Sequence, residues 1–311
     1  MLSFIYATRS YAEKYKYHYE YFPLLEQWRL FVDGDKQNIP TELNGLGFEN
    51  REPGYMNAMF KAFSYIRATA GAQISEEFIK KLHFYCTSGV QFSARGGRDV
   101  KKIQPGEYYS RKADLHSGFQ LHLRKNASES GIVELLNTMS EDSGLCITIE
   151  NPENFSSTTI NSEWIETHGM ANAIKLLKSY SCPLRVCTQT TSTDEISLKL
   201  KLLIENFNFN IKNAANTKHT KLILIISFIR RLVWLHPFQD ANTRVFVMQL
   251  LNKCLVENGF PPTILDNPND FDGHGIEELV NMTKIGFSNF NFVKEQHYWP
   301  NTASTINKAK L

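Results

Sequence analysis

A helix that is apolar nearly all the way round is the feature that most constrains this chain. The segment from Thr220 to Leu235 carries few polar side chains, and a helix with hydrophobic residues on every face must be buried. A second apolar helix is predicted from Val245 to Val256. It should end at Asn258-Gly259, because glycine suits the residue after a helix. The chain is therefore expected to fold around two adjacent core helices.

The loop between these helices, His236 to Arg244, is polar and charged, with the sequence HPFQDANTR. A charged loop held between two core helices has no packing purpose, so it is expected to carry chemistry. It leads onto the N-terminus of the second helix, where unpaired backbone N–H groups and the helix dipole favour an anion. The loop therefore predicts a phosphate-binding site.

Four polar side chains of the loop fit the transfer of a phosphate-containing group to a hydroxyl. Arg244, in the first helical turn, can donate a fork of hydrogen bonds to phosphate oxygens. Asn242 can cap the helix or donate to the same anion. Asp240 is placed to hold Mg²⁺, which prefers one or two carboxylates together with substrate oxygens. His236 can accept the proton of an attacking hydroxyl, and such general-base help is typically worth ~10²–10⁴-fold in rate.

The loop resembles the motif of the Fic (Fido) family, which reads HPF-x-[D/E]-[G/A]-N-[G/K]-R. Pro237 and Phe238 match its structural positions, and Phe238 is expected to turn into the core. Thr243 is the one mismatch. The resemblance implies an all-α fold of the Fic type, which is a helical bundle with a small β-hairpin flap. Here a helical N-terminal extension is expected in addition.

The resemblance also implies a role for each polar residue of the motif. His236 would be the catalytic base and Asp240 the Mg²⁺ ligand. The phosphates of a nucleotide would be held by three consecutive residues, Asn242, Thr243 and Arg244.

Segments outside the motif extend the resemblance. The run Ser75–His83 is similar to the helix that opens the family's fold, with Ser75 as its N-cap. Gly131–Met139 is similar to the helix that follows the flap. The segment that begins at Pro105 resembles the flap of the family. The residues expected to dock the target are Gly106, Tyr108, Tyr109 and Arg111.

Composition and the resemblance divide the chain into three parts. An aromatic-rich extension is predicted over 1–70, a Fic-like catalytic domain over 71–290 and a C-terminal tail over 291–311. The catalytic domain is expected to contain an insertion between about 150 and 190. Within the extension, Tyr11, Tyr15 and Tyr19 stand at helical spacing. The run from 15 to 21 also alternates as a strand would, but helix is favoured because the family is helical.

Two positions leave the identity of the donor open. Thr243 replaces the glycine of adenylyl-transferring members with a stiffer residue, whose side chain lies where the backbone would approach phosphate. Val247 stands where many adenylyl transferases carry a second arginine for the terminal phosphates. The Asp-Ala-Asn variant of the motif also occurs in Fic effectors that transfer phosphocholine from CDP-choline.

The favoured hypothesis is AMPylation, in which AMP from ATP is attached to a Tyr, Ser or Thr side chain of a target protein with Mg²⁺ as cofactor. The target would add as a strand along the flap. Three alternatives remain. They are phosphocholine transfer from CDP-choline, phosphoryl transfer in the reversed donor pose of the Doc kinases, and a catalytically degenerate scaffold that binds a partner.

Composition argues against several other classes. A total of 34 Lys and Arg against 32 Asp and Glu gives a net charge of +2, too balanced for a nucleic-acid surface. Five cysteines without a CxxC pair favour a reducing compartment. No stretch reaches the ~20 apolar residues of a membrane span, and too few residues precede Arg9 for a signal peptide. A cytoplasmic protein is therefore expected, or an effector delivered into a host cytosol.

Overall fold

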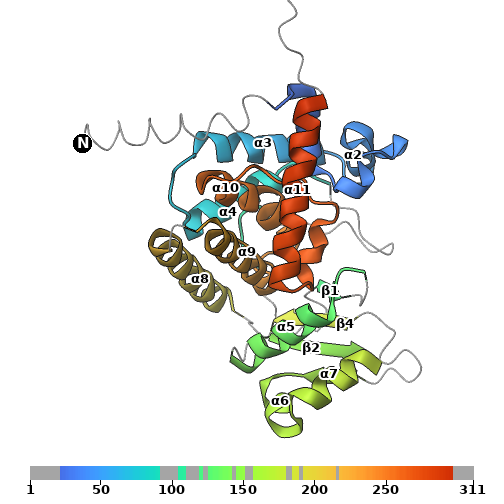
Figure 1. The fold of residues 1–311 in the computed structure, drawn as a ribbon, viewed down its shortest axis with the longest axis vertical. Coiled ribbons are helices and arrows are strands. Elements are labelled where there is room, and N and C mark those ends of the chain that lie inside the picture. Colours follow the sequence, from blue (N-terminus) through green and yellow to red (C-terminus); the bar gives the residue numbers. More distant parts are fainter. Residues whose placement is uncertain are drawn as a thin grey trace, which may run out of the picture.

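The computed structural model describes residues 22–91, 104–109, 119–121, 125–141, 145–150, 157–179, 184–188, 192–214 and 217–296 of the 311-residue chain. Within these ranges the chain is mainly helical, and other helices surround a central one, α9 (Figure 1). The all-α class that the sequence predicts is therefore confirmed.

Helix α9, Lys218–Leu235, forms the centre of the core. Thr217 caps its N-terminus, because the Thr217 side-chain oxygen accepts a hydrogen bond from the Thr220 N–H at 3.3 Å. Buried side chains lie on several faces of the helix, which packs against α8, α10 and α11. The predicted burial of this helix on all sides is confirmed.

The second core helix has two parts. It starts as a π-helix, η4 (Arg244–Leu250), and continues as α10 (Leu251–Glu257). It ends at Asn258 and Gly259, and the φ of 80° at Gly259 is in the left-handed region that suits glycine. The predicted end is confirmed. The π-helical start was not predicted, and such turns are frequent at functional sites.

Further helices pack around this pair. The longer ones are α3 (Tyr55–Ala68), α4 (Glu76–Thr87), α8 (Thr193–Asn213) and α11 (Ile276–Gln296). The predicted N-cap of α4 is confirmed, since Ser75 Oγ accepts a hydrogen bond from the Phe78 N–H at 3.1 Å. No helix in the described ranges has the length and hydrophobicity that crossing a bilayer requires.

Short helical turns make up the described chain before α3. They are η1 (Leu24–Phe31), η2 (Gly34–Lys36), η3 (Pro40–Gly45) and α2 (Leu46–Arg51). Phe22 is buried and stacks on Phe290 of α11, with the ring centroids 4.5 Å apart. The N-terminal part is thus helical from residue 24 onward, as expected, whereas Tyr11, Tyr15 and Tyr19 lie outside the described residues.

A small antiparallel sheet lies in a separate lobe, at the bottom of Figure 1. The strands lie in the order β1 (Phe119–Leu121), β4 (Leu184–Thr188), β2 (Leu145–Glu150) and β3 (Ser157–Ile160). Three helices complete the lobe, α5 (Glu129–Glu141), α6 (Ser162–His168) and α7 (Met170–Ser179). The sheet was not predicted. The lobe includes most of the described residues of the expected insertion, but β1 and β2 precede the insertion in sequence.

The lobe meets the helical core where two backbones touch. Ser128 N–H donates to the Gly273 carbonyl at 3.0 Å, just before α5 begins. A side-chain carbon added at Gly131 would lie 1.9 Å from that same carbonyl oxygen. The joint is reinforced by Arg230 of α9, whose Nη1 pairs with Glu134 at 2.5 Å. Glycine at 131 is therefore required by close approach of the chain.

We expect Gly131→Ala to lower the free energy of unfolding by about 1–3 kcal/mol, because the added methyl overlaps the Gly273 carbonyl and forces the backbones apart. Urea unfolding of the variant measures this loss. Ser140→Ala is the matched control, since Ser140 is exposed on the same helix. An unfolding midpoint equal to that of Ser140→Ala would contradict the close approach.

A second prediction concerns Asp272 in the 3-10 helix η5 (Pro268–Asp272), whose backbone carbonyl accepts a hydrogen bond from Trp234 Nε1 at 2.8 Å. Burial raises the pKa of Asp272 to about 8, with Asn126 lowering it and Asp270 raising it further. The folded protein therefore keeps a proton that the unfolded chain releases near pH ~4. Stability should fall as the pH rises from ~4 to 8, and then level off.

Asp272→Asn should remove about 1.4 kcal/mol per pH unit from that slope. The measurement is the unfolding free energy of both proteins at several pH values between 5 and 9. Asp194→Asn, at an exposed position of α8, serves as the control. Parallel pH profiles for the wild type and Asp272→Asn would show that the carboxyl titrates normally.

Candidate functional site

The motif loop has an unusual backbone. His236 ends α9 with a φ of 47°, and Ala241 has a φ of 63°, both in the left-handed region that non-glycine residues seldom adopt. Such conformations persist only where the surroundings hold them, and they cluster at functional sites. Ala241 stands where the Fic motif allows only glycine or alanine, and small side chains tolerate this conformation best.

Asn242 holds the loop together. It is 3% exposed, and its side-chain amide makes hydrogen bonds with both the N–H and the carbonyl of the Phe238 backbone. Its Oδ1 accepts from the Phe238 N–H at 3.2 Å, and its Nδ2 donates to the Phe238 carbonyl at 2.9 Å. The structure thus places Asn242 inside the loop that it closes, and the predicted contact with phosphate remains a prediction.

Phe238 turns into the core, as the sequence predicts, and is fully buried. Its ring stacks on His83 of α4, with centroids 3.8 Å apart and planes 4° from parallel. Tyr108 and Phe246 also contact it, at centroid distances of 5.6 and 6.1 Å. The neighbouring Pro237 is buried, and its carbonyl accepts a hydrogen bond from the Tyr109 N–H at 3.1 Å.

Asp240 is exposed at the outer end of the loop. Its Oδ1 accepts a hydrogen bond from the Ala241 N–H at 2.6 Å, which orients the carboxylate. Within the described residues, no three His, Cys, Asp or Glu side chains gather where they could hold a metal ion. A single oriented carboxylate still fits Mg²⁺, since this ion commonly takes its remaining ligands from water and substrate phosphates.

Arg244 reaches towards the N-terminal part of the chain. Its Nη2 pairs with the carboxylate of Glu52, and its guanidinium lies 4.8 Å from the centre of the Tyr55 ring. The side chain is 13% exposed. Thr243 is more exposed and its hydroxyl donates to Asn269 Oδ1 at 3.5 Å. The first charged residue of the second core helix is therefore oriented by residues that sequence reasoning did not assign.

The segment 104–109, expected to form the flap, is held against the motif loop. It contains a turn at Pro105 and Gly106 but no strand, so its described part does not form the expected β-hairpin. The physical reason is that its backbone bonds elsewhere. Gly106 N–H donates to His83 Nδ1 at 2.9 Å, and Tyr109 N–H donates to the Pro237 carbonyl. Arg111 lies outside the described residues.

Tyr108 fastens the same segment to α4. Its hydroxyl donates to Glu76 Oε1 at 2.9 Å, and Lys80 Nζ lies 4.3 Å from the centre of its ring. Burial alone would raise the pKa of Glu76, but hydrogen bonds from Ser197, Lys80, Tyr108 and Lys201 lower it to about 2. Tyr108 is thus an anchor of the segment, in addition to the predicted docking role.

His83 is a site residue whose role was not predicted from the sequence. It is fully buried, and burial lowers its pKa to about 4, which the neighbouring Asp240 backbone only partly opposes. The imidazole is therefore neutral. A lone histidine among apolar residues of a helix gave no signal of this role, because its partners Gly106 and Phe238 are distant in sequence.

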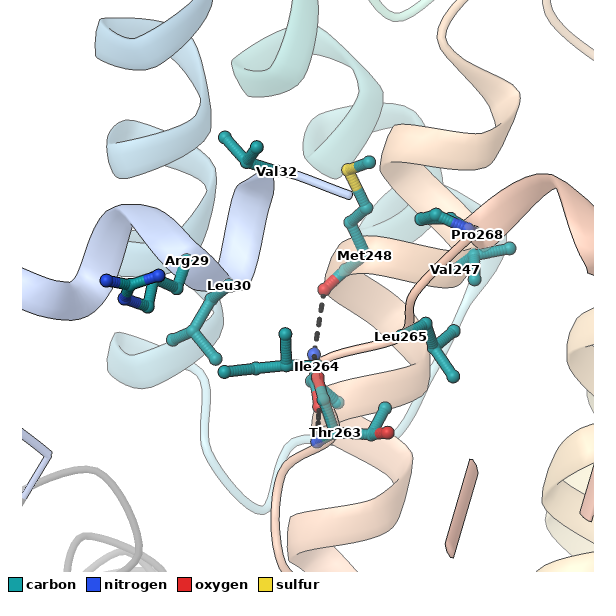
Figure 2. Close-up of a pocket in the computed structure, with 10 residues that line it drawn as sticks. Arg29, Leu30, Val32, Val247, Met248, Thr263, Ile264, Leu265 and Pro268 are labelled. Carbon is teal, nitrogen blue, oxygen red and sulfur yellow. Dashed lines mark hydrogen bonds between the residues drawn. The ribbon is translucent and has the colours of Figure 1, made fainter. Parts of the chain in front are cut away.

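Val247 lies on the inner side of η4, away from solvent. It is 1% exposed and lines a small cavity together with Leu30, Val32 and Leu265 (Figure 2). The cavity has room for about one water molecule. An arginine at this position would have to bury its charge in apolar surroundings, at considerable cost. The packing of η1 on η4 thus explains why a second arginine does not fit here.

Comparison with known proteins supports a Fic-like family. No protein-family model matches the sequence. The chain is 28% identical over 293 residues to the phosphocholine transferase AnkX of Legionella pneumophila. The matched region is 90% of this chain and 29% of AnkX, so the chain spans less than a third of the length of that relative.

We expect Asn242→Asp to destabilise the protein by about 2–3 kcal/mol, because a buried carboxylate would face the Phe238 carbonyl without a proton to donate. Asn137→Asp, an exposed change on α5, is the control and should leave stability nearly unaltered. Thermal unfolding of both variants measures the difference. Equal unfolding temperatures would mean that the Asn242 amide does not close the loop.

Proposed function

We propose that this chain transfers phosphocholine from CDP-choline to a hydroxyl side chain of a target protein. The observation that carries the proposal is the similarity to a phosphocholine transferase along 90% of the chain. The motif HPFQDANTR adds to it, since its Asp-Ala-Asn variant also occurs in Fic effectors that transfer phosphocholine from CDP-choline.

The reaction exchanges one phosphorus–oxygen bond for another. The target hydroxyl oxygen attacks the phosphorus atom that bears choline. The bond from that phosphorus to the bridging diphosphate oxygen breaks, and CMP leaves with the electron pair. The proton of the attacking hydroxyl passes to His236. Catalysis then consists mainly of holding the two reactants in line and stabilising negative charge on the phosphates.

The ends of the two core helices supply the residues for this chemistry. His236 ends α9, so its position is fixed by the buried helix before it. Arg244 begins η4 and would donate to the diphosphate from the helix N-terminus, with Asn242 and Thr243 beside it. Mg²⁺ bound at Asp240 would neutralise diphosphate charge.

Val247 favours CDP-choline over ATP as the donor. In adenylyl transferases of this family, a second arginine grips the terminal phosphates, and here that position is apolar and buried beneath η1. A diphosphate donor has no third phosphate that needs such a partner. AMPylation, which the motif alone favoured, therefore becomes the second candidate.

The target would dock beside residues 104–109. Tyr109 N–H is directed to Pro237, and successive backbone groups of an extended segment point to opposite sides. The backbone of Tyr108 would then face outward, where a target strand could pair with it. The acceptor is expected to be a Ser, Thr or Tyr side chain.

The test is intact-protein mass spectrometry after the purified chain is incubated with Mg²⁺ and either CDP-choline or ATP, alone and with a cell lysate. We expect a phosphocholine adduct on the chain itself or on a lysate protein. His236→Ala should reduce its formation by ~10²–10⁴-fold without lowering the unfolding temperature. His219→Ala is the matched control, because that histidine is exposed.

The mass of the adduct distinguishes the candidates. An AMP adduct formed from ATP would replace the proposal with AMPylation, and a phosphate adduct would indicate the reversed donor pose. No adduct from either donor, even in lysate, would favour the binding scaffold. Transfer by His236→Ala at the rate of His219→Ala would overturn the role of His236.

A further inference from the structure

We propose that His83 is a positioning residue, which fixes segment 104–109 relative to the motif loop and thereby sets where the acceptor hydroxyl meets His236. The inference rests on the proposed function for its kinetic consequence. Its geometric basis is the contact of one buried side chain with both of these segments.

The first contact fixes the protonation of the ring. His83 Nδ1 accepts the Gly106 N–H at 2.9 Å, and a nitrogen that accepts a hydrogen bond carries no proton. The neutral imidazole must then hold its proton on Nε2, which is buried and has no hydrogen-bond partner among the described residues. Burial lowers the pKa of His83 to about 4, so this state persists across the physiological range.

The second contact is with the motif loop. The imidazole lies flat on Phe238, at a centroid distance of 3.8 Å, and Phe238 is the residue whose backbone Asn242 holds at both ends. Any shift of the His83 ring is therefore transmitted to the loop between His236 and Asp240. The ring acts as a rigid spacer between the loop and the segment 104–109.

Gly106 brings the segment close enough for this contact. Its φ is 81°, and a side-chain carbon there would lie 3.3 Å from the Lys80 carbonyl oxygen and 3.5 Å from Phe84 Cβ. The turn thus rests directly on α4. Two further contacts hold it, from Tyr109 N–H to Pro237 and from the Tyr108 hydroxyl to Glu76.

These contacts separate the acceptor side from the donor side. The segment 104–109 is expected to align the target hydroxyl, whereas the diphosphate is expected at residues 242–244. Loss of the hydrogen bond between His83 and Gly106 should therefore impair transfer to a protein hydroxyl more than transfer to water. A displacement of about 1 Å is enough to reduce a rate on the order of 10²-fold.

The test compares His83→Phe with His83→Asn. Phenylalanine keeps the stacked ring and removes the acceptor for Gly106 N–H, whereas asparagine can present Oδ1 near the position of Nδ1. With Mg²⁺ and CDP-choline as the probe, mass spectrometry follows self-modification and CMP release follows hydrolysis by water. His219→Asn is the matched surface control.

We expect His83→Phe to lower the ratio of self-modification to hydrolysis on the order of 10²-fold and His83→Asn to restore part of it. Hydrogen exchange at Gly106 and Tyr109 should be faster in His83→Phe than in the wild type. Nitrogen NMR of the wild-type imidazole at pH 7 should show the proton on Nε2.

An unchanged ratio in His83→Phe would overturn the proposal. So would an equal loss of both reactions in His83→Phe and His83→Asn together with lower unfolding temperatures, because that result indicates a structural role alone. A wild-type protein that uses no donor would instead overturn the proposed function. In that case, hydrogen exchange and NMR still decide whether His83 fixes the segment, and a proton on Nδ1 would show that it does not.

Discussion

The two hydrogen bonds between the Asn242 side chain and the Phe238 backbone are the interaction on which the rest of the site depends. They close a loop that contains two residues in the left-handed region, each of which costs about 1–2 kcal/mol. Burial of Phe238 and the helices on either side offset that cost. With the loop closed, His236 stands at the end of one core helix and Arg244 at the start of the next.

The N-terminal part of the chain takes part in the same arrangement from the other side. Glu52 pairs with Arg244, and Tyr55 lies beneath the guanidinium, so the arginine is oriented before any phosphate arrives. An incoming diphosphate would share or replace the Glu52 carboxylate as the partner of Arg244. At the next turn, Val247 is buried against η1, so an arginine in its place would have to bury its side chain. The extension therefore shapes the site, and this connection was not predicted from the sequence.

The structural features that were predicted from the sequence depend on residues that are neighbours in the chain. The features that were not predicted depend on contacts between distant segments. The apolar run of α9, the Asn258-Gly259 helix end and the Ser75 cap were all readable, because each depends on neighbouring residues. The sheet was not, since its strand β4 pairs with β1 and β2, which are separated from it in sequence by several other elements. The contacts of residues 104–109 are also long-range, because Tyr109 N–H bonds Pro237 and Gly106 N–H bonds His83.

The same distinction separates the two sides of the site. The donor side lies within one continuous loop, and a motif of nine residues was enough to suggest its chemistry. The proposed acceptor side is assembled from segment 104–109, from α4 through His83 and Glu76, and from α8, whose Ser197 bonds Glu76 at 2.8 Å. Because Glu76 also holds Tyr108, a change in α8 can reach segment 104–109, which we propose aligns the target, without contacting the motif loop. In the proposed function, target choice would then vary along α4 and α8 while the motif loop, closed by Asn242, keeps its shape.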